Sequence, residues 1–193
     1  MNSLDMYERI KSVTSDLERV ATDARERFSG LSSDQLNWKP AEKRWSVGQC
    51  FDHLITTHSL YLPLFERLAK GETTPTFWEI ASPFSRFFGR YLIRSLSPDN
   101  EKKMKTSAKA LPSTSEIDGR IIQMFCDHQN KMIEHLQKLS ANVEPAKMII
   151  TSPLVGIVTY SLDDCFTILV VHCQRHYGQA KHVTEAKGFP VPS

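Results

Sequence analysis

The chain has 193 residues, of which 40% are hydrophobic and 24% are charged, and its formal net charge is +2. This composition is ordinary for a folded globular protein and excludes extensive disorder. The nearly balanced charge gives no whole-molecule argument for binding nucleic acid, so we expect no nucleic-acid partner. The length suits one domain, and we expect residues 1–193 to form a single domain.

Neither a targeting signal nor a membrane span is evident in the sequence. No apolar run approaches the length of about 20 residues that crosses a membrane. The first ten residues contain Asp5 and Glu8 and lack the apolar stretch of a secretory signal. The cysteines form no CxxC pair, which indicates reduced thiols. We therefore expect a cytoplasmic protein with no membrane partner and with four free cysteines: Cys50, Cys126, Cys165 and Cys173.

Apolar residues recur at helical spacing in the first half of the chain. The first such segment covers residues 4–28. The second covers residues 46–70 and opens on Ser46 and Gln49, the pattern of a capping box in which each side chain accepts from the other residue's backbone N–H. Pro63 has no N–H, so it predicts a bend in the second helix.

Two more helices are expected in the second half. The third covers residues 113–139 and opens on another box pattern, Ser113 followed by Glu116. The fourth covers residues 161–187, with a serine at its first position. Glycine is sparse at 8 residues, and turn pairs typical of β-hairpins are almost absent. The sequence therefore predicts an all-α fold, a four-helix bundle.

The connection between the second and third helices, residues 71–112, is long for a bundle, in which about 2–8 residues are usual. Residues 83–94 within it predict a short extra helix with an aromatic face. An exposed aromatic cluster usually packs against a partner. We expect this face either to form a homodimer interface or to fold back over its own helices. Its aromatic residues are Phe84, Phe87, Phe88 and Tyr91.

The same connection is locally basic, with seven basic and two acidic residues between positions 86 and 109. The simplest interpretation is a solvated surface. The alternatives are an interface with a partner chain or a rim that attracts an anionic substrate. In the last case Arg86, Arg90 and Arg94 are candidates to bind substrate carboxylates.

Two of the seven histidines, His172 and His176, are four residues apart and so share one face of the fourth helix. Imidazoles placed in this way can bind one metal ion, at about 2.0–2.1 Å if the ion is zinc. Such a pair arises by chance in roughly one chain of this composition in four, so ordinary hydrogen-bonded histidines are the alternative. No glutamate stands between them, unlike the zincin motif.

A third histidine makes a metal site more plausible. His53 lies about two turns into the second helix. If the second and fourth helices run parallel, His53 meets His172 and His176 at a similar depth in the core. Three histidines with open positions for water or substrate are typical of a catalytic site. The set suits one divalent ion, Zn, Ni, Fe or Mn.

The other histidines are expected to have different roles. His128 and His135 are seven residues apart, too far to chelate one ion without further ligands, so we expect hydrogen-bonding or surface positions. His58 is predicted to point elsewhere, with a proton carrier near the site as the alternative. His182 is expected to be exposed.

Four aromatic residues and two polar residues near the candidate ligands are interpreted structurally. Cys50 is expected to be a buried thiol, with a soft fourth ligand as the less favoured alternative. Asp52 diverges from His53 by about 100° and is not expected to bind the same metal. We expect packing roles for Trp38, Trp45, Phe51 and Tyr177.

At this point the chain resembles a known family, the DinB-like superfamily. The resemblance covers most of the chain, from the first helix to about residue 183, and depends on the two histidine segments together. The matching features are WSVGQ at 45–49, DHL at 52–54, PLVG at 153–156, and His172, Arg175, His176 and Gln179 on the last helix.

The resemblance implies a four-helix bundle with an unusual helix order, which the long 71–112 connection would accommodate. Its members include YfiT-like metal-dependent hydrolases and bacillithiol- or mycothiol-dependent transferases. Carried over by position, their metal ligands fall on His53, His172 and His176, with Gln179 a companion one turn further on.

The functional expectation is a metal-dependent enzyme with a three-histidine site, a thiol-dependent S-transferase or a hydrolase acting on a small molecule. Its nucleophile would be a metal-bound water or a thiolate. The lack of a glutamate beside the paired histidines slightly favours the thiolate, so a low-molecular-weight thiol is one expected partner. The alternative is a non-catalytic metal-binding or interaction bundle.

Overall fold

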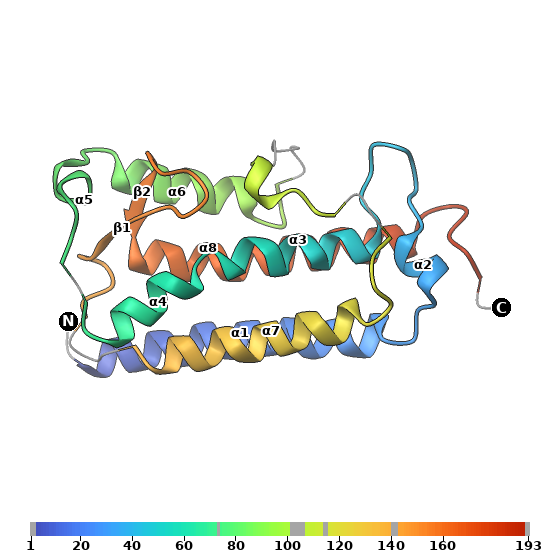
Figure 1. The fold of residues 1–193 in the computed structure, drawn as a ribbon, viewed down its shortest axis with the longest axis horizontal. Helices are drawn as coiled ribbons and strands as arrows, with labels where there is room; N and C mark the ends of the chain where they lie inside the picture. The colour runs from blue at the N-terminus through green and yellow to red at the C-terminus, as the bar shows by residue number, and fades with distance from the viewer. Residues whose placement is uncertain (1–2, 73, 101–106, 114–115, 140–142, 192–193) are drawn as a thin grey trace.

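The computed structural model describes residues 3–72, 74–100, 107–113, 116–139 and 143–191. The described chain is mostly helical, with one small two-stranded sheet (Figure 1). The predicted helical class is therefore confirmed, and the sheet is an addition that the sequence did not reveal.

Four of the helices correspond to long predicted segments: α1 (Ser3–Phe28), α3 (Val47–Ser59), α7 (Ile121–Gln137) and α8 (Leu162–Thr184). The shorter helices are α2 (Ser33–Asn37), α4 (Leu62–Ala69), α5 (Phe77–Ala81), α6 (Ser85–Leu96) and the 3₁₀ turn η1 (Ala108–Ala110). The strands are β1 (Ile149–Thr151) and β2 (Thr159–Ser161).

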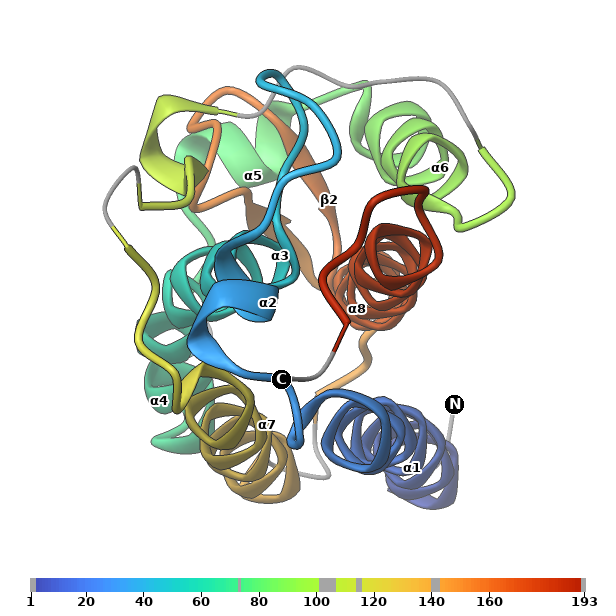
Figure 2. The same cartoon turned by 90° about the vertical axis from the view of Figure 1, so that its right-hand side faces the viewer.

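Helices α1 and α8 run in the same direction. Arg9 near the start of α1 pairs with Asp163 at the start of α8, and Arg27 near the end of α1 pairs with Glu185 just after α8, at 2.9 Å. Helix α1 packs on α7 and α8, and α3 packs on the same two helices. Viewed end-on, α6 lies beside α8 on the side away from α1 (Figure 2).

Helices α3 and α8 run in opposite directions, so the expectation that the histidine-bearing helices are parallel is wrong. Tyr61, just after α3, bonds Tyr160, just before α8, through hydroxyls 2.8 Å apart. At the other end, Trp45 before α3 stacks on His176 in the second half of α8. The candidate ligands still meet, because His53 and the α8 histidines all lie away from the ends of their helices.

The second predicted helix is divided in two. α3 ends at Ser59 and α4 begins at Leu62. Pro63 occupies the first turn of α4, where its missing N–H is not needed. The predicted bend is therefore a break, and both bonds of the predicted capping box, between Ser46 and Gln49, are present.

The third helix begins later than predicted. α7 starts at Ile121, and residues 114–115 of the expected first turn lie outside the described residues. The proposed box fails because its members make tertiary contacts instead. The Ser113 N–H donates to Asp52 at 2.7 Å, and Glu116 accepts from Ser33 at 3.2 Å.

The sheet is a short antiparallel hairpin in which Ile150 pairs with Tyr160. Its residues are mostly β-branched or aromatic and so suit a strand. Three-residue strands are too short to produce a readable alternation, which is why the sequence pattern missed them.

The long connection contains the predicted extra helix as α6, together with α5 and η1. Three of its aromatic residues, Phe84, Phe87 and Tyr91, are 54–63% exposed, so they do not fold back over the chain's own helices. Homodimerisation through this face stays a prediction, as do the single-domain assignment and the cytoplasmic location. None of the described helices has the length and apolar character to cross a membrane.

Candidate metal centre

The start of α3 fixes the position of His53. The Ser46 side chain accepts from the Gln49 N–H, and the Gln49 side chain accepts from the Ser46 N–H. Between them, Gly48 allows α3 to approach its neighbours closely, since a Cβ there would lie 2.9 Å from Ile117 and 3.1 Å from the Leu36 carbonyl. His53 follows less than two turns into this anchored helix and is buried.

The other two candidates lie on one face of α8. His172 and His176 are both buried, and their ring centroids are 4.7 Å apart. Ser161 caps the helix by accepting from the Asp164 N–H, and acidic residues in the first turn suit the positive end of the helix dipole. The predicted i, i+4 geometry is therefore present.

The three imidazoles converge at one place. His53 Nε2 lies 3.1 Å from His172 Nε2, and the ring centroids of His53 and His176 are 4.6 Å apart. All three residues offer ligand atoms within 4.8 Å of one another. Nitrogens bonded to one ion at 2.0–2.1 Å lie roughly 3.0–3.4 Å apart when the angle at the ion is near 90–110°. The closest pair already has this spacing, and the third ligand atom lies within 4.8 Å of both.

Hydrogen bonds orient each ring. His53 Nδ1 faces the Ala110 carbonyl, which can only accept, so Nδ1 carries the hydrogen and leaves Nε2 free. His176 Nδ1 donates to Gln179 Oε1 at 3.0 Å, and Gln179 is the companion residue that the family resemblance named. When His172 also carries its hydrogen on Nδ1, the Nε2 lone pairs of His53 and His172 face each other and repel, and a cation between them removes the repulsion.

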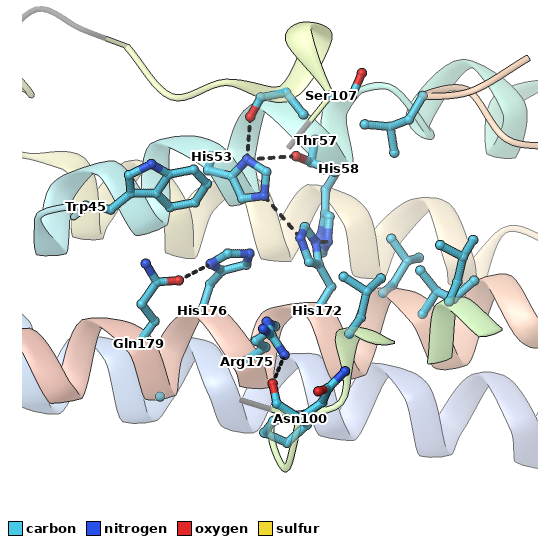
Figure 3. Close-up of a pocket in the computed structure, with 18 of the residues that line it drawn as sticks. Trp45, His53, Thr57, His58, Asn100, Ser107, His172, Arg175, His176 and Gln179 are labelled. Carbon is cyan, nitrogen blue, oxygen red and sulfur yellow. Dashed lines mark hydrogen bonds between the residues drawn. The ribbon is translucent and has the colours of Figure 1, made fainter. Parts of the chain in front are cut away.

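The third orienting group is His58, which the sequence analysis expected to point elsewhere. That expectation is wrong. His58 is fully buried, and its Nε2 lies 3.2 Å from His172 Nδ1. Its own Nδ1 lies 3.9 Å from Cys173 Sγ. When His172 Nδ1 donates to His58, all three ligand candidates present Nε2 to the same point (Figure 3).

Burial keeps these rings neutral. Loss of solvation is the main cause that lowers the pKa of all four imidazoles, and proximity to other histidines contributes at His58, His172 and His176. The pKa of His176 falls to about 3. Neutral imidazole is the form that binds metals, so protons do not compete strongly for these nitrogens near pH 7.

Trp45 forms a wall of the centre. Its ring stacks on His176 at 5.4 Å and 23°, and it contacts His53 at 4.8 Å (Figure 3). The sequence suggested only a packing role for Trp45. The sequence did offer a signal for a place beside the histidines. Trp45 stands immediately before the capping box of α3, a position that faces the same side as His53.

The histidines line a cavity of about 1090 Å³, large enough for a small molecule. Among the described residues that line it there is no aspartate or glutamate, and the Lys and Arg residues are Lys43, Arg44 and Arg175. This described part of the wall therefore offers imidazoles and cations and no carboxylate base.

The arginines proposed to hold an anionic substrate lie elsewhere. Arg86, Arg90 and Arg94 are exposed on α6 and are not among the residues that line this cavity. Arg175 does line the cavity, but it is bonded to the backbone. Its Nη1 donates to the carbonyls of Ser97 at 3.0 Å and Asn100 at 2.6 Å. It thereby ties the end of α6 to α8.

The remaining histidines make other contacts. His128 Nε2 bonds Ser59 at 3.0 Å, and His135 lies 2.7 Å from the Lys131 carbonyl. His182 is exposed, as predicted.

Cys50 is a fully buried thiol, as expected, and burial raises the pKa of that thiol. All four cysteines are free, which agrees with the predicted reduced state. Asp52 bonds the backbone of Ser113 and not a ligand candidate. Trp38 and Tyr177 pack against Phe189 and Phe28.

The comparison with protein families agrees with this geometry. The model described as the DinB superfamily matches residues 16–180, a range that contains all three ligand candidates. No curated protein and no solved structure matches the chain. Because the family model spans far more than half of the 193 residues, the chain belongs to the DinB superfamily.

Proposed function

We propose that this protein is a metal-dependent enzyme built on a four-helix bundle, in which His53, His172 and His176 hold one divalent ion beside the cavity. The observation that carries the proposal is the orientation of the rings. Three Nε2 atoms point inward, and each ring's Nδ1 faces its own hydrogen-bond partner. Histidines that serve only to fill a core have no need of three separate orienting groups.

Zn, Ni, Fe and Mn all accept three imidazoles, so the donor set fits a divalent ion without choosing one. When bound, such an ion lowers the pKa of a water or thiol beside it and supplies a nucleophile near neutral pH. Three protein ligands leave further positions open to the cavity, which is the arrangement of catalytic rather than structural sites.

The chain's own residues position and shield this centre. The Ala110 carbonyl, His58 and Gln179 hold the three rings in one tautomer. Trp45 covers one side and reduces access of water to His176. The burial of the rings keeps them neutral and ready to bind.

The lack of a carboxylate among the described residues of the cavity wall favours the S-transferase over the hydrolase. Hydrolysis is normally assisted by a general base that takes a proton from the attacking water. A thiol has a lower pKa than water and loses its proton on binding, so it needs no such base. A small molecule and a low-molecular-weight thiol are therefore the proposed substrates.

Metal analysis and turnover test the proposal together. We expect about one divalent ion per chain after purification without chelator, and conjugation of small thiols to a model electrophile. His53→Ala, His172→Ala and His176→Ala should each abolish both, whereas His128→Ala, a histidine outside the centre, should retain them. Turnover that survives all three substitutions would refute the proposed centre.

The alternative is a non-catalytic metal-binding bundle. It would bind the ion through the same histidines but would neither conjugate thiols nor cleave esters and amides. The cavity beside the rings favours the enzyme, since a purely structural centre is normally closed by a fourth protein ligand.

A further inference from the structure

The cavity changes character along α8, and the histidines mark the boundary. Before His172, the α8 residues that line it are Ile168 and Leu169, which are aliphatic and buried. After His176, the lining includes Gln179 and the exposed His182, together with Gly178 and Val183. The part of the cavity before His172 is therefore the more aliphatic part.

Helix α6 supplies a second wall of this more aliphatic part. It runs alongside α8 in the same direction, since its Gly89 touches Asp164 near the start of α8 and its end is bonded to Arg175. A Cβ on Gly89 would lie 2.3 Å from Asp164 Oδ2, so glycine permits this close approach. As a result Leu92 and Leu96 lie beside the stretch of α8 that leads to the histidines.

The hairpin loop supplies the third wall through Leu154 and Val158. Together these residues form what we call the aliphatic lobe: Leu92, Leu96, Leu154, Val158, Ile168 and Leu169.

Tyr61 also lines the cavity, and its hydroxyl is already paired. The Tyr61 and Tyr160 hydroxyls bond each other at 2.8 Å. Burial raises the pKa of both, so they remain neutral phenols. Ser152 nearby accepts from the Val155 N–H at 3.3 Å. A ligand group in the lobe therefore meets carbon atoms and polar atoms that have partners of their own.

We propose that the aliphatic lobe binds the apolar part of the substrate, so that the substrate class of the histidine centre is a small molecule with an aliphatic chain and a polar reacting group. This inference rests on the proposed function, because the histidines must hold the reacting group. Apolar surface transferred from water to this lobe drives the binding, and the rings at its inner end select the polar group.

The geometry limits the length of the chain. Tyr61 follows His53 by eight positions and lies just after the end of α3, a rise of about 12 Å. We expect the lobe to extend roughly this far from the rings, enough for about eight carbon atoms.

Alkyl hydroxamates test the lobe without knowledge of the natural substrate, because the hydroxamate binds the metal and only the chain varies. We would titrate the zinc-loaded full chain with aceto-, butano-, hexano-, octano- and decanohydroxamate by calorimetry. The Kd should fall about three- to fourfold per methylene, up to about eight carbons, and then level off.

Substitutions locate the effect. Leu154→Asn and Val158→Asn should each reduce the advantage of octano- over acetohydroxamate at least tenfold and leave the Kd of acetohydroxamate unchanged. Ile157→Asn is the matched control, since Ile157 is next to Val158 but 72% exposed and outside the lining. It should leave the whole series unchanged.

The outcomes separate the two proposals. Equal affinities along the series, with acetohydroxamate bound, overturn the lobe and leave the metal centre standing. An advantage that persists in Leu154→Asn and Val158→Asn also overturns the lobe. Affinities that are equal in zinc-loaded and metal-free protein for every member of the series overturn the proposed metal-dependent function, while a gain with chain length in both forms still supports the lobe.

Discussion

Two buried polar regions of this protein differ in how well their atoms are paired. In the histidine centre between α3 and α8, each Nδ1 of the three candidate ligands has a partner. On α7, by contrast, His128 Nδ1 and both amide atoms of Gln129 are buried without a hydrogen-bond partner among the described residues. The first region is organised around a common point, and the second is not.

The hydrogen-bond pairing of buried polar atoms therefore distinguishes a binding site from unpaired polar groups in the core. An unpaired buried polar atom costs about 1–3 kcal/mol. The α7 region bears that cost with nothing in the described structure to offset it. In the histidine centre, the Nε2 atoms of His53 and His172 lie 3.1 Å apart. When each described ring carries its hydrogen on Nδ1, the Nε2 lone pairs face one another, which is what a cation requires.

The sharpest test of this contrast is stabilisation by metal. Zn²⁺ at one hundred times its Kd should raise the free energy of unfolding by about 2.7 kcal/mol. In a chain of this size that corresponds to a rise in Tm of roughly 5–10 °C. His53→Ala removes a ligand, so affinity should fall by more than about 100-fold, which leaves less than about 0.4 kcal/mol at the same zinc concentration. Differential scanning calorimetry with zinc or with chelator measures both.

His128→Ala provides the matched comparison for that measurement. It lowers the basal stability, but the rise in Tm on adding zinc should equal that of the parent protein. If His128→Ala removes the zinc response while His53→Ala keeps it, the metal binds on α7 and the assignment is wrong.

The second test is the pH dependence of stability. Burial, assisted by Lys131, lowers the pKa of His128 from 6.5 to about 4. Above pH 6.5 neither state binds the proton. As the pH falls, the unfolded chain becomes protonated and the folded chain does not, so stability is lost between pH 6.5 and 4. The loss attributable to His128 is about 3 kcal/mol at pH 4.

Urea unfolding of chelator-treated protein at pH 7.5, 6 and 5 should therefore show His128→Gln gaining on the parent as the pH falls. His53, His172 and His176 contribute equally to both proteins and cancel. His128 also helps to lower the pKa of His58, so its loss changes the His58 contribution in the same direction. The control is His182→Gln, which changes an exposed ring. A difference between His128→Gln and the parent that stays constant with pH would contradict the predicted direction.

The third test concerns the orientation of His172. In His58→Leu, the acceptor for His172 Nδ1 is lost, and the ring can then carry its hydrogen on Nε2, where the metal should bind. We expect zinc affinity, measured by competition with a chromophoric chelator, to fall about 10- to 100-fold. His58→Gln supplies an amide oxygen near the same place and should recover most of the affinity. Equal losses in both variants would indicate a packing role only.

Whether a helix start could be predicted from the sequence depends on how far apart in the sequence the bonding residues lie. The helix starts at Ser46 and Ser161 were readable because a cap is decided within four residues. The start of α7 was not, because Ser113 and Glu116 bond partners more than sixty positions away in the sequence. Similar local patterns therefore led to different structures.

The candidate ligands were predictable for a related reason. The spacing of His172 and His176 fixes their shared face, and the family resemblance added His53. The orienting groups were harder to predict, because they depend on how α3 crosses α8. His58 meets His172 only because the two helices are antiparallel, and the Ala110 carbonyl has no side-chain signal at all.

The smallest predicted effect tests the α7 region itself. Gln129 is fully buried, and Gln129→Met keeps its length while removing two unpaired polar atoms. We expect the free energy of unfolding to rise by about 1–2 kcal/mol, measured by urea denaturation. Gln137→Met, at an exposed position of the same helix, should change it by less than about 0.5 kcal/mol. A decrease in Gln129→Met would mean that the amide has a binding partner in solution, so that the unpaired region is a polar site in its own right and the contrast with the histidine centre fails.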